Sequence, residues 1–235
     1  MLENTLNALK NYIPPADWKG GNIFLLPEDA MRYIHQFIIE NKLVDCVELG
    51  TGFGATSCVI VDALEILNAG HLTTIDRYFH QPVNVKVLLD HANVPDKRLE
   101  IVADILGYNW YLPEVLRHQT QDGICKPRFD FCLLDGAHEW EPDALAFNLI
   151  APLIKPNGWV AIDDLNFCLR MIPNWQESHG NHSDKELDTY QMQMVYDLVV
   201  KTHPDFCDFH ISHDGRIGWA RKRPTAKKTF FSFLR

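Results

Sequence analysis

The sequence predicts an α/β fold in which helices cover both faces of a mostly parallel β-sheet. Five short apolar runs alternate with helical patterns along the chain. A turn with three glycines follows the first run, and Asp214-Gly215 joins two strand-like runs near the other end, which is a hairpin signal. The chain has 235 residues, 46% of them hydrophobic, so a single domain over 1–235 with a full core is expected.

The elements follow one another in regular order. The predicted strands are the apolar runs 43–49, 71–76, 99–104, 129–135 and 158–163. Continuous hydrophobic stretches within the last two are typical of parallel strands buried on both faces. The predicted helices are 28–41, 55–69, 80–92, 108–119, 139–155 and 188–202, with Pro82 in the first turn of its helix. The runs 206–212 and 216–221 are predicted to pair as an antiparallel hairpin, which completes a sheet of seven strands.

Residues 47–54 read Val-Glu-Leu-Gly-Thr-Gly-Phe-Gly and are predicted to form a nucleotide-binding corner between a strand and a helix. Glycines let the backbone turn tightly and lie against a ligand, and the first N–H groups of the following helix are unpaired. The same glycine spacing also fits an NAD site, which stays open as the main rival. Glu48, however, suits a cationic ligand better than a pyrophosphate.

This stretch resembles motif I of the class I S-adenosylmethionine (SAM) methyltransferases, whose cofactor carries a sulfonium and an amino group. An antiparallel hairpin that closes a parallel sheet is also a hallmark of their fold. The resemblance implies cofactor contacts at Glu48, Gly50, Thr51, Gly52, Gly54, Asp76, Asp104 and Asp135. Asp76 would accept hydrogen bonds from the ribose hydroxyls. Asp104 would lie at the adenine, or would instead be the N-cap of the next helix.

Three aspartates end the fourth and fifth predicted strands: Asp135, and then Asp163 and Asp164. Because neighbouring strands lie ~4.8 Å apart, these carboxylates are expected to converge beyond the edge of the sheet. Carboxylates gathered in this way raise one another's pKa values unless a cation lies among them. An all-oxygen set favours Mg²⁺, Mn²⁺ or Ca²⁺ over Zn²⁺, so these three residues are predicted to bind a divalent cation, with Mg²⁺ as the expected ion.

Asp135 with His138, followed by the Asp163-Asp164 pair, resembles the divalent-metal-dependent O-methyltransferases of the macrocin type. Catechol O-methyltransferase is more distantly similar and usually has Asn as the second residue of the pair. The resemblance covers about 44–165 and implies methyl transfer from SAM to a hydroxyl of a small molecule: a sugar, a natural product or a phenol. Asp135 and His138 would be the catalytic residues. His138 is expected one helical turn after Asp135, where it would act as the base, or would only orient a metal ligand or contact the cofactor.

The other segments are interpreted by their place relative to the core at 43–165. Residues 1–42 are predicted to be an N-terminal helical cap. The polar and aromatic stretch 166–188 is predicted to be a lid over the acceptor, or else a disordered loop. The basic tail, 222–235, follows the hairpin at 206–221. Its apolar residues are expected to pack on the body or on a partner subunit, which leaves a homo-oligomer open.

Composition limits the partners and the location. A net charge of −9 argues against binding of a phosphate backbone, so no nucleic-acid partner is expected. The six cysteines form no C-x-x-C pair, and neither a membrane span nor a signal peptide is evident, which predicts a reduced, cytoplasmic protein. Two alternatives besides NAD binding stay open. One is a methyltransferase that uses no metal, and the other is a non-catalytic module that contacts RNA or a protein through its basic tail.

Overall fold

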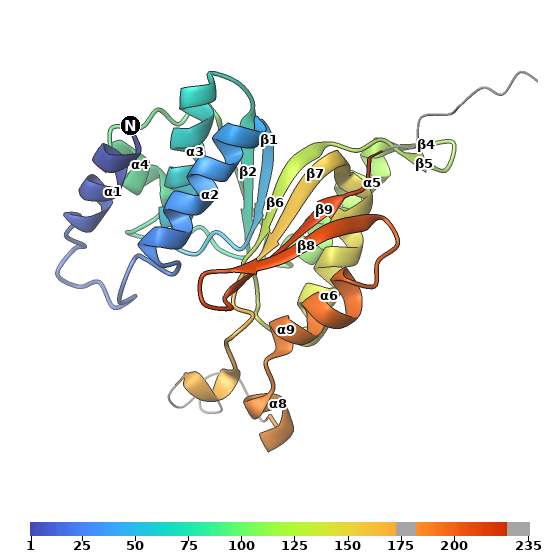
Figure 1. Ribbon diagram of the computed structural model, residues 1–235. Helices are drawn as coiled ribbons and strands as arrows, with labels where there is room; N and C mark the ends of the chain where they lie inside the picture. The colour runs from blue at the N-terminus through green and yellow to red at the C-terminus, as the bar shows by residue number, and fades with distance from the viewer. Residues whose placement is uncertain (173–181, 225–235) are drawn as a thin grey trace, which may run out of the picture.

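A computed structural model describes residues 1–172 and 182–224, and in these residues seven strands form one sheet (Figure 1). The strand order is β3-β2-β1-β6-β7-β9-β8. These strands are β1 (Asp45–Leu49), β2 (His71–Asp76), β3 (Leu99–Ala103), β6 (Phe129–Leu134), β7 (Ile154–Ile162), β8 (Phe206–Ser212) and β9 (Ile217–Lys222). All pairs from β3 to β7 are parallel, and β9 is antiparallel to both β7 and β8. The predicted fold class is confirmed.

Helices cover both faces of the sheet (Figure 1). On one face, a buried cluster contains residues of α1 (Leu2–Lys10), α2 (Glu28–Asn41), α3 (Ala55–Leu67) and α4 (Val85–His91). On the other, the cluster contains residues of α5 (Tyr108–Gln119), α6 (Trp140–Ile150), α9 (Gln191–Val195) and the π-helix Tyr196–Val200. The remaining short elements are α8 (Asp184–Asp188), the 3₁₀ helices Ala151–Leu153 and Leu169–Met171, and a small hairpin of β4 (Thr120–Gln121) and β5 (Ile124–Cys125).

Several predicted helix boundaries were wrong, each because a local feature determines where the helix starts or stops. The helix predicted for 80–92 begins only at Val85, since the Asn84 side chain caps it by accepting from the N–H groups of Lys86 and Val87 at 3.1 and 3.2 Å. Pro82 therefore lies before the helix. The helix predicted for 139–155 stops at Ile150, because a 3₁₀ turn leads directly into β7. The helix predicted for 188–202 starts at Gln191 and is a short α-helix that continues as a π-helix.

The cysteines and the helices agree with parts of the compositional predictions. Cys46, Cys58 and Cys132 are buried in β1, α3 and β6, and all six thiols of the chain are free. No helix within 1–172 and 182–224 has the length and apolar character needed to cross a membrane.

The glycine turn is fixed by close packing between the ends of β1 and β6. Leu49 lies opposite Leu134 in the parallel register, so Gly50 follows directly beside Asp135. Gly50 has a φ of 101°, and a Cβ added there would lie 1.7 Å from the backbone oxygen of Asp135. This glycine is therefore required by the packing of two strands as well as by the turn. The ends of the two strands are held together at the point where the aspartates begin.

Replacing Gly50 with Ala is expected to destabilise the protein by roughly 2–5 kcal/mol, from the positive φ and the backbone clash together. Gly123→Ala is the matched control, because Gly123 has a φ of 75° with nothing within 4 Å of an added Cβ. It should lose only about 1–2 kcal/mol. Urea unfolding of both variants measures the difference, and equal losses would contradict the role of strand packing.

Candidate active site

A cavity of about 450 Å³ lies beyond the carboxyl ends of β1, β2, β6 and β7, a size usual for small-molecule sites. The sequence-predicted residues that line it are Glu48, Gly50, Thr51, Gly52, Gly54, Asp76, Asp135, His138 and Asp164. Asp104 and Asp163 are not among its lining residues. The cavity thus brings together most of the residues that were singled out, although their individual roles stay predictions.

Glu48 is almost fully buried below the glycine turn, with 1% of its surface exposed. Its Oε2 accepts hydrogen bonds from Ser57 Oγ and from Thr74 Oγ1, the latter at 2.6 Å, and Thr74 Oγ1 also contacts Thr51 Oγ1. Burial raises the pKa of Glu48 to about 8, the two hydrogen bonds oppose the rise, and nearby carboxylates add to it. A positively charged ligand in the cavity would favour the ionised form of this carboxyl group.

Asp76 ties the end of β2 to the glycine turn. Its Oδ2 accepts from the backbone N–H groups of Thr51 at 3.0 Å and of Gly52 at 2.9 Å, and its Oδ1 accepts from the N–H of Arg77 at 2.6 Å. Each carboxylate oxygen has two lone pairs, so Oδ1 can accept one more hydrogen bond, and Asp76 lines the cavity. The structure therefore gives Asp76 a supporting role that sequence reasoning missed, and its contact with ribose stays a prediction.

Asp104 stands outside the cavity wall. Its side chain accepts from the N–H of Leu106 at 2.9 Å, which shapes the loop before α5. The N-cap of α5 is Gly107, so the alternative role of Asp104 as a helix N-cap was wrong. Leu106 and Gly107 line the cavity in its place, and the adenine contact of Asp104 stays a prediction.

The loop after β6 is held by a buried carboxylate. Asp143 accepts from Tyr108 Oη at 2.5 Å and from the N–H groups of Ala137 and Glu139 at 3.4 and 3.2 Å. Burial raises the pKa of Asp143 and these donors oppose the rise. Gly136 is required here, because a Cβ would lie 2.3 Å from Tyr108 Oη. His138 lies in this loop, between the bonded N–H groups of Ala137 and Glu139, so these bonds determine the direction of its side chain.

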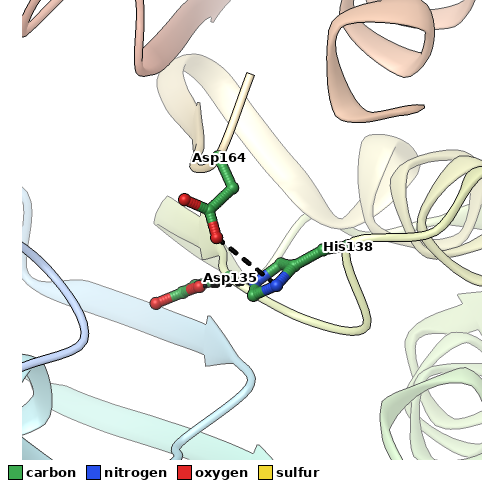
Figure 2. Close-up of side chains that lie close together, drawn as sticks. All are labelled: Asp135, His138 and Asp164. Carbon is green, nitrogen blue, oxygen red and sulfur yellow. Dashed lines mark hydrogen bonds and ion pairs between the residues drawn. The ribbon is translucent and has the colours of Figure 1, made fainter. Parts of the chain in front are cut away.

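His138 lies between two carboxylates (Figure 2). Its Nε2 is 3.0 Å from Asp135 Oδ1, and its Nδ1 is 3.3 Å from Asp164 Oδ2. One ligand atom from each of the three residues lies within 4.8 Å of the others. The expected helical turn between Asp135 and His138 was wrong, since His138 has a left-handed φ of 59° and α6 begins only at Trp140. The left-handed backbone achieves the predicted proximity by another route.

The charges around His138 favour its protonated form. Burial lowers the pKa of His138. The hydrogen bond with Asp135 and the negative charges of Asp135 and Asp164 outweigh this effect and raise the pKa to about 9. In the absence of another cation, the imidazole is therefore protonated at neutral pH. A base with this pKa becomes available only when a positive charge offsets the two carboxylates.

Asp163 is fully buried and is bound by an arginine that sequence reasoning missed. Arg216 donates from Nε and Nη2 to the two carboxylate oxygens of Asp163, both at 2.7 Å, and its Nη2 is 2.8 Å from Asp164 Oδ1. Burial raises the pKa of Asp163 to about 7, and the charge of Asp135 adds to the rise, whereas Arg216 opposes it. The structure groups Asp135 and Asp164 with His138 and pairs Asp163 with Arg216. The metal role of all three aspartates stays a prediction.

The position of Arg216 follows from strand register. Ile162 lies opposite Gly218 in the antiparallel β7·β9 pair, so Asp164 falls opposite Arg216 just beyond the sheet, where Leu165 N–H donates to Arg216 O at 2.9 Å. The signal was the predicted hairpin itself, since its turn must lie next to the end of β7.

The predicted lid is described only in part, because 173–181 lie outside the described residues. Phe167 and Ile172 line the cavity, and the Phe167 ring meets the His138 ring edge-on with centroids 5.6 Å apart. Further along, α8 lies apart from the sheet (Figure 1) and packs on the 3₁₀ helix Leu169–Met171.

The predicted basic tail, 222–235, is also described only in part. Lys222 is the last residue of β9, and 225–235 lie outside the described residues.

Comparison with known proteins identifies the class. A family model of a methyltransferase domain matches residues 47–165, about half of the chain, and the chain belongs to this methyltransferase domain family. No curated protein matches it. The prediction of a methyltransferase is thereby confirmed.

Solved structures with the same fold include several O-methyltransferases. An O-methyltransferase from Bacillus cereus in complex with SAH is 16% identical, covers 94% of this chain and 90% of that chain, and gives a TM-score of 0.59. TomG from Streptomyces achromogenes, an O-methyltransferase of tomaymycin synthesis solved with SAM, is 15% identical. The match covers 94% of this chain and 89% of TomG, with a TM-score of 0.57. MycE, a methyltransferase of mycinamycin biosynthesis solved with Mg, SAH and mycinamycin VI, is 15% identical. The match covers 86% of this chain and 51% of MycE, with a TM-score of 0.54. At these identities the likeness is one of fold.

In metal-free protein, His138 is expected to titrate with a pKa of about 9. Adding Mg²⁺ should lower this pKa, because a cation at Asp135 and Asp164 offsets the charges that stabilise the imidazolium. Asp135→Asn should lower it as well. NMR of the histidine ring signals measures all three values, and a metal-free pKa at or below 6.5 would contradict this account.

Proposed function

We propose that this protein is a SAM-dependent O-methyltransferase that acts on a hydroxyl group of a small molecule. The observation that carries the proposal is the arrangement of His138 between Asp135 and Asp164, in the same cavity as the glycine turn and Glu48. Bound S-adenosylmethionine would supply an activated methyl group at this point. The family membership and the SAM- or SAH-bound proteins with the same fold support the choice of cofactor.

The glycine turn and the ends of β1 and β2 form the cofactor half of the proposed site. Glu48 offers a buried carboxyl group that a positively charged ligand would favour in its ionised form, whereas a pyrophosphate would gain no such attraction there. Asp76, fixed by the N–H groups of Thr51 and Gly52, is available to ribose hydroxyls. A positively charged ligand at Glu48 favours SAM over NAD and is the main reason to prefer this cofactor, whereas a ribose contact at Asp76 is shared by SAM and NAD sites.

The acceptor half lies at the ends of β6 and β7. His138 is proposed to remove the hydroxyl proton of the acceptor through Nε2, once the acceptor takes the place of Asp135 at this nitrogen, while Nδ1, which faces Asp164, keeps its proton and orients the ring. The neighbouring walls are apolar and come from Ile23, Leu25, Phe167 and Ile172. Apolar walls around a proton-accepting centre suit a hydroxyl carried on a ring or a hydrocarbon skeleton. They offer little to a highly charged acceptor, which supports a sugar, natural-product or phenol class.

A divalent cation fits the same centre, with Asp135 and Asp164 as its ligands. The ligand atoms of Asp135, Asp164 and His138 lie within 4.8 Å of one another, so the two carboxylates could hold Mg²⁺ or Mn²⁺ with the imidazole beside the ion. Such an ion would polarise the acceptor oxygen. The same charge would lower the pKa of His138 and release it as a base at neutral pH. The presence of Mg in the MycE complex supports this assignment by analogy of fold alone.

A calorimetric titration with SAH tests the cofactor assignment, with NADH as the comparison ligand. SAH should bind to wild-type protein and equally to His138→Asn, because His138 acts on the acceptor.

Methyl transfer from labelled SAM to a panel of phenols and sugars should fall by about 10²–10⁴-fold in His138→Asn. His118→Ala, at an exposed position in the last turn of α5, is the matched histidine control and should keep both properties. Binding of NADH instead of SAH would exclude the proposal.

Metal dependence has a separate test on the wild-type enzyme. EDTA should reduce methyl transfer to less than about one tenth, and Mg²⁺ should restore it, because the cation both polarises the acceptor and frees His138. Full turnover in EDTA would favour the alternative, a methyltransferase that uses no metal. A small-molecule enzyme should stay mostly active after truncation near Arg223. SAH binding without methyl transfer, and loss of an RNA or protein contact on this truncation, would instead favour a non-catalytic module that works through its basic tail.

A further inference from the structure

Arg216 is the side chain that separates the two aspartates at the end of β7. In an extended strand, consecutive side chains point to opposite faces. Asp164, however, has a left-handed φ of 59°, and this brings its carboxylate to the same guanidinium group that binds Asp163. The planar fork of Arg216 takes both oxygens of Asp163 and one oxygen of Asp164.

This pairing divides the acidic edge into two parts. Each carboxylate oxygen of Asp163 accepts from the permanently charged Arg216, and the Asp163 side chain is fully buried and does not line the cavity. Asp135 and the Oδ2 atom of Asp164 lie on the other side, against His138. A metal ion on the oxygens of Asp163 would lie against the guanidinium fork, and the repulsion between the two positive charges disfavours binding there.

We propose that Arg216 is a positioning residue that keeps Asp163 out of the metal-binding set of the proposed methyltransferase site. The resident guanidinium already neutralises one carboxylate and part of a second. A divalent cation is therefore held by Asp135 and Asp164 alone, with His138 beside them. Since the affinity of such sites rises with the number of charged ligands, the site binds a metal ion weakly until an acceptor oxygen joins it.

The same arginine connects the acidic edge with the N-terminal wall of the cavity. Its Nη2 also donates to the backbone oxygen of Leu25 at 3.1 Å, and Leu25 lines the cavity. Arg216 is thus fixed from two directions, by the carboxylates and by the segment before α2. This double anchorage makes the guanidinium a built-in part of the site rather than a mobile surface charge.

The test measures Mn²⁺ binding by loss of the free-ion EPR signal, which needs no acceptor and no turnover. Arg216→Met should bind Mn²⁺ about tenfold tighter than wild type or more, because Asp163 becomes available as a ligand. Arg216→Met/Asp163→Asn should return to the wild-type affinity. Arg77→Met is the matched control, since Arg77 lines the same cavity and no contact of its side chain with Asp135, Asp163 or Asp164 occurs in the described residues. It should leave Mn²⁺ affinity within about twofold of wild type.

Unchanged or weaker Mn²⁺ binding in a folded Arg216→Met variant would overturn the proposal, as would an equal gain in Arg77→Met. If Arg216→Met does not fold, Arg216→Lys decides, because an ammonium group cannot span both oxygens of Asp163 and should also tighten Mn²⁺ binding. SAH binding is measured on the same samples. Its absence from the wild type would refute the proposed function, whereas normal SAH binding with no gain in Mn²⁺ affinity would refute only the role of Arg216.

Discussion

The site depends on the neutralisation of carboxylates that the sheet gathers at one buried edge. Leu134 and Ile162 lie side by side in β6 and β7, so the aspartates that follow these residues emerge together. Burial raises the pKa values of Asp163 and Asp164. Without positive charge nearby, such an edge would take up protons or push its loops apart. The protein supplies Arg216 and His138, one from the hairpin and one from a loop.

The placement of His138 rests on contacts one layer away from it. The buried carboxylate of Asp143 would be costly if it were unpaired, but Tyr108 Oη and the backbone N–H groups of the loop satisfy it. Burial and the neighbouring carboxylate also raise the pKa of Tyr108, so its hydroxyl stays a donor. Since Tyr108 begins α5 and Asp143 lies in α6, these two helices determine the shape of the loop. The position of His138 therefore depends on how α5 and α6 pack on one face of the sheet.

The sequence predicted the carboxyl ends of the parallel strands to within one residue, because buried parallel strands are continuous apolar runs. The start of β7 was wrong, since the strand begins at Ile154 and not at 158. The bounds of α2 and α5 were also predicted at both ends. The start of α4 was not, since the capping bonds of Asn84 compete with an earlier start at Pro82. The predicted hairpin placed Arg216 near the end of β7, but it did not show how Asp163 and Asp164 would divide their partners. They depend on one left-handed residue and on an arginine more than fifty positions away.

The arginine also couples parts of the cavity that the chain order keeps far apart. Leu25 packs over the glycine turn so closely that a Cβ on Gly52 would lie 2.6 Å from its Cδ1 atom, and its backbone oxygen accepts from Arg216. Moving this wall away from the cavity would break one hydrogen bond to Arg216, a cost of about 1.5–3 kcal/mol because the donor is charged. The paired oxygens of Asp163 would keep the guanidinium in place meanwhile. The charges that hold His138 and Asp164 therefore depend mainly on the pairing of Arg216 with Asp163, and the bond to Leu25 ties the wall to this pair.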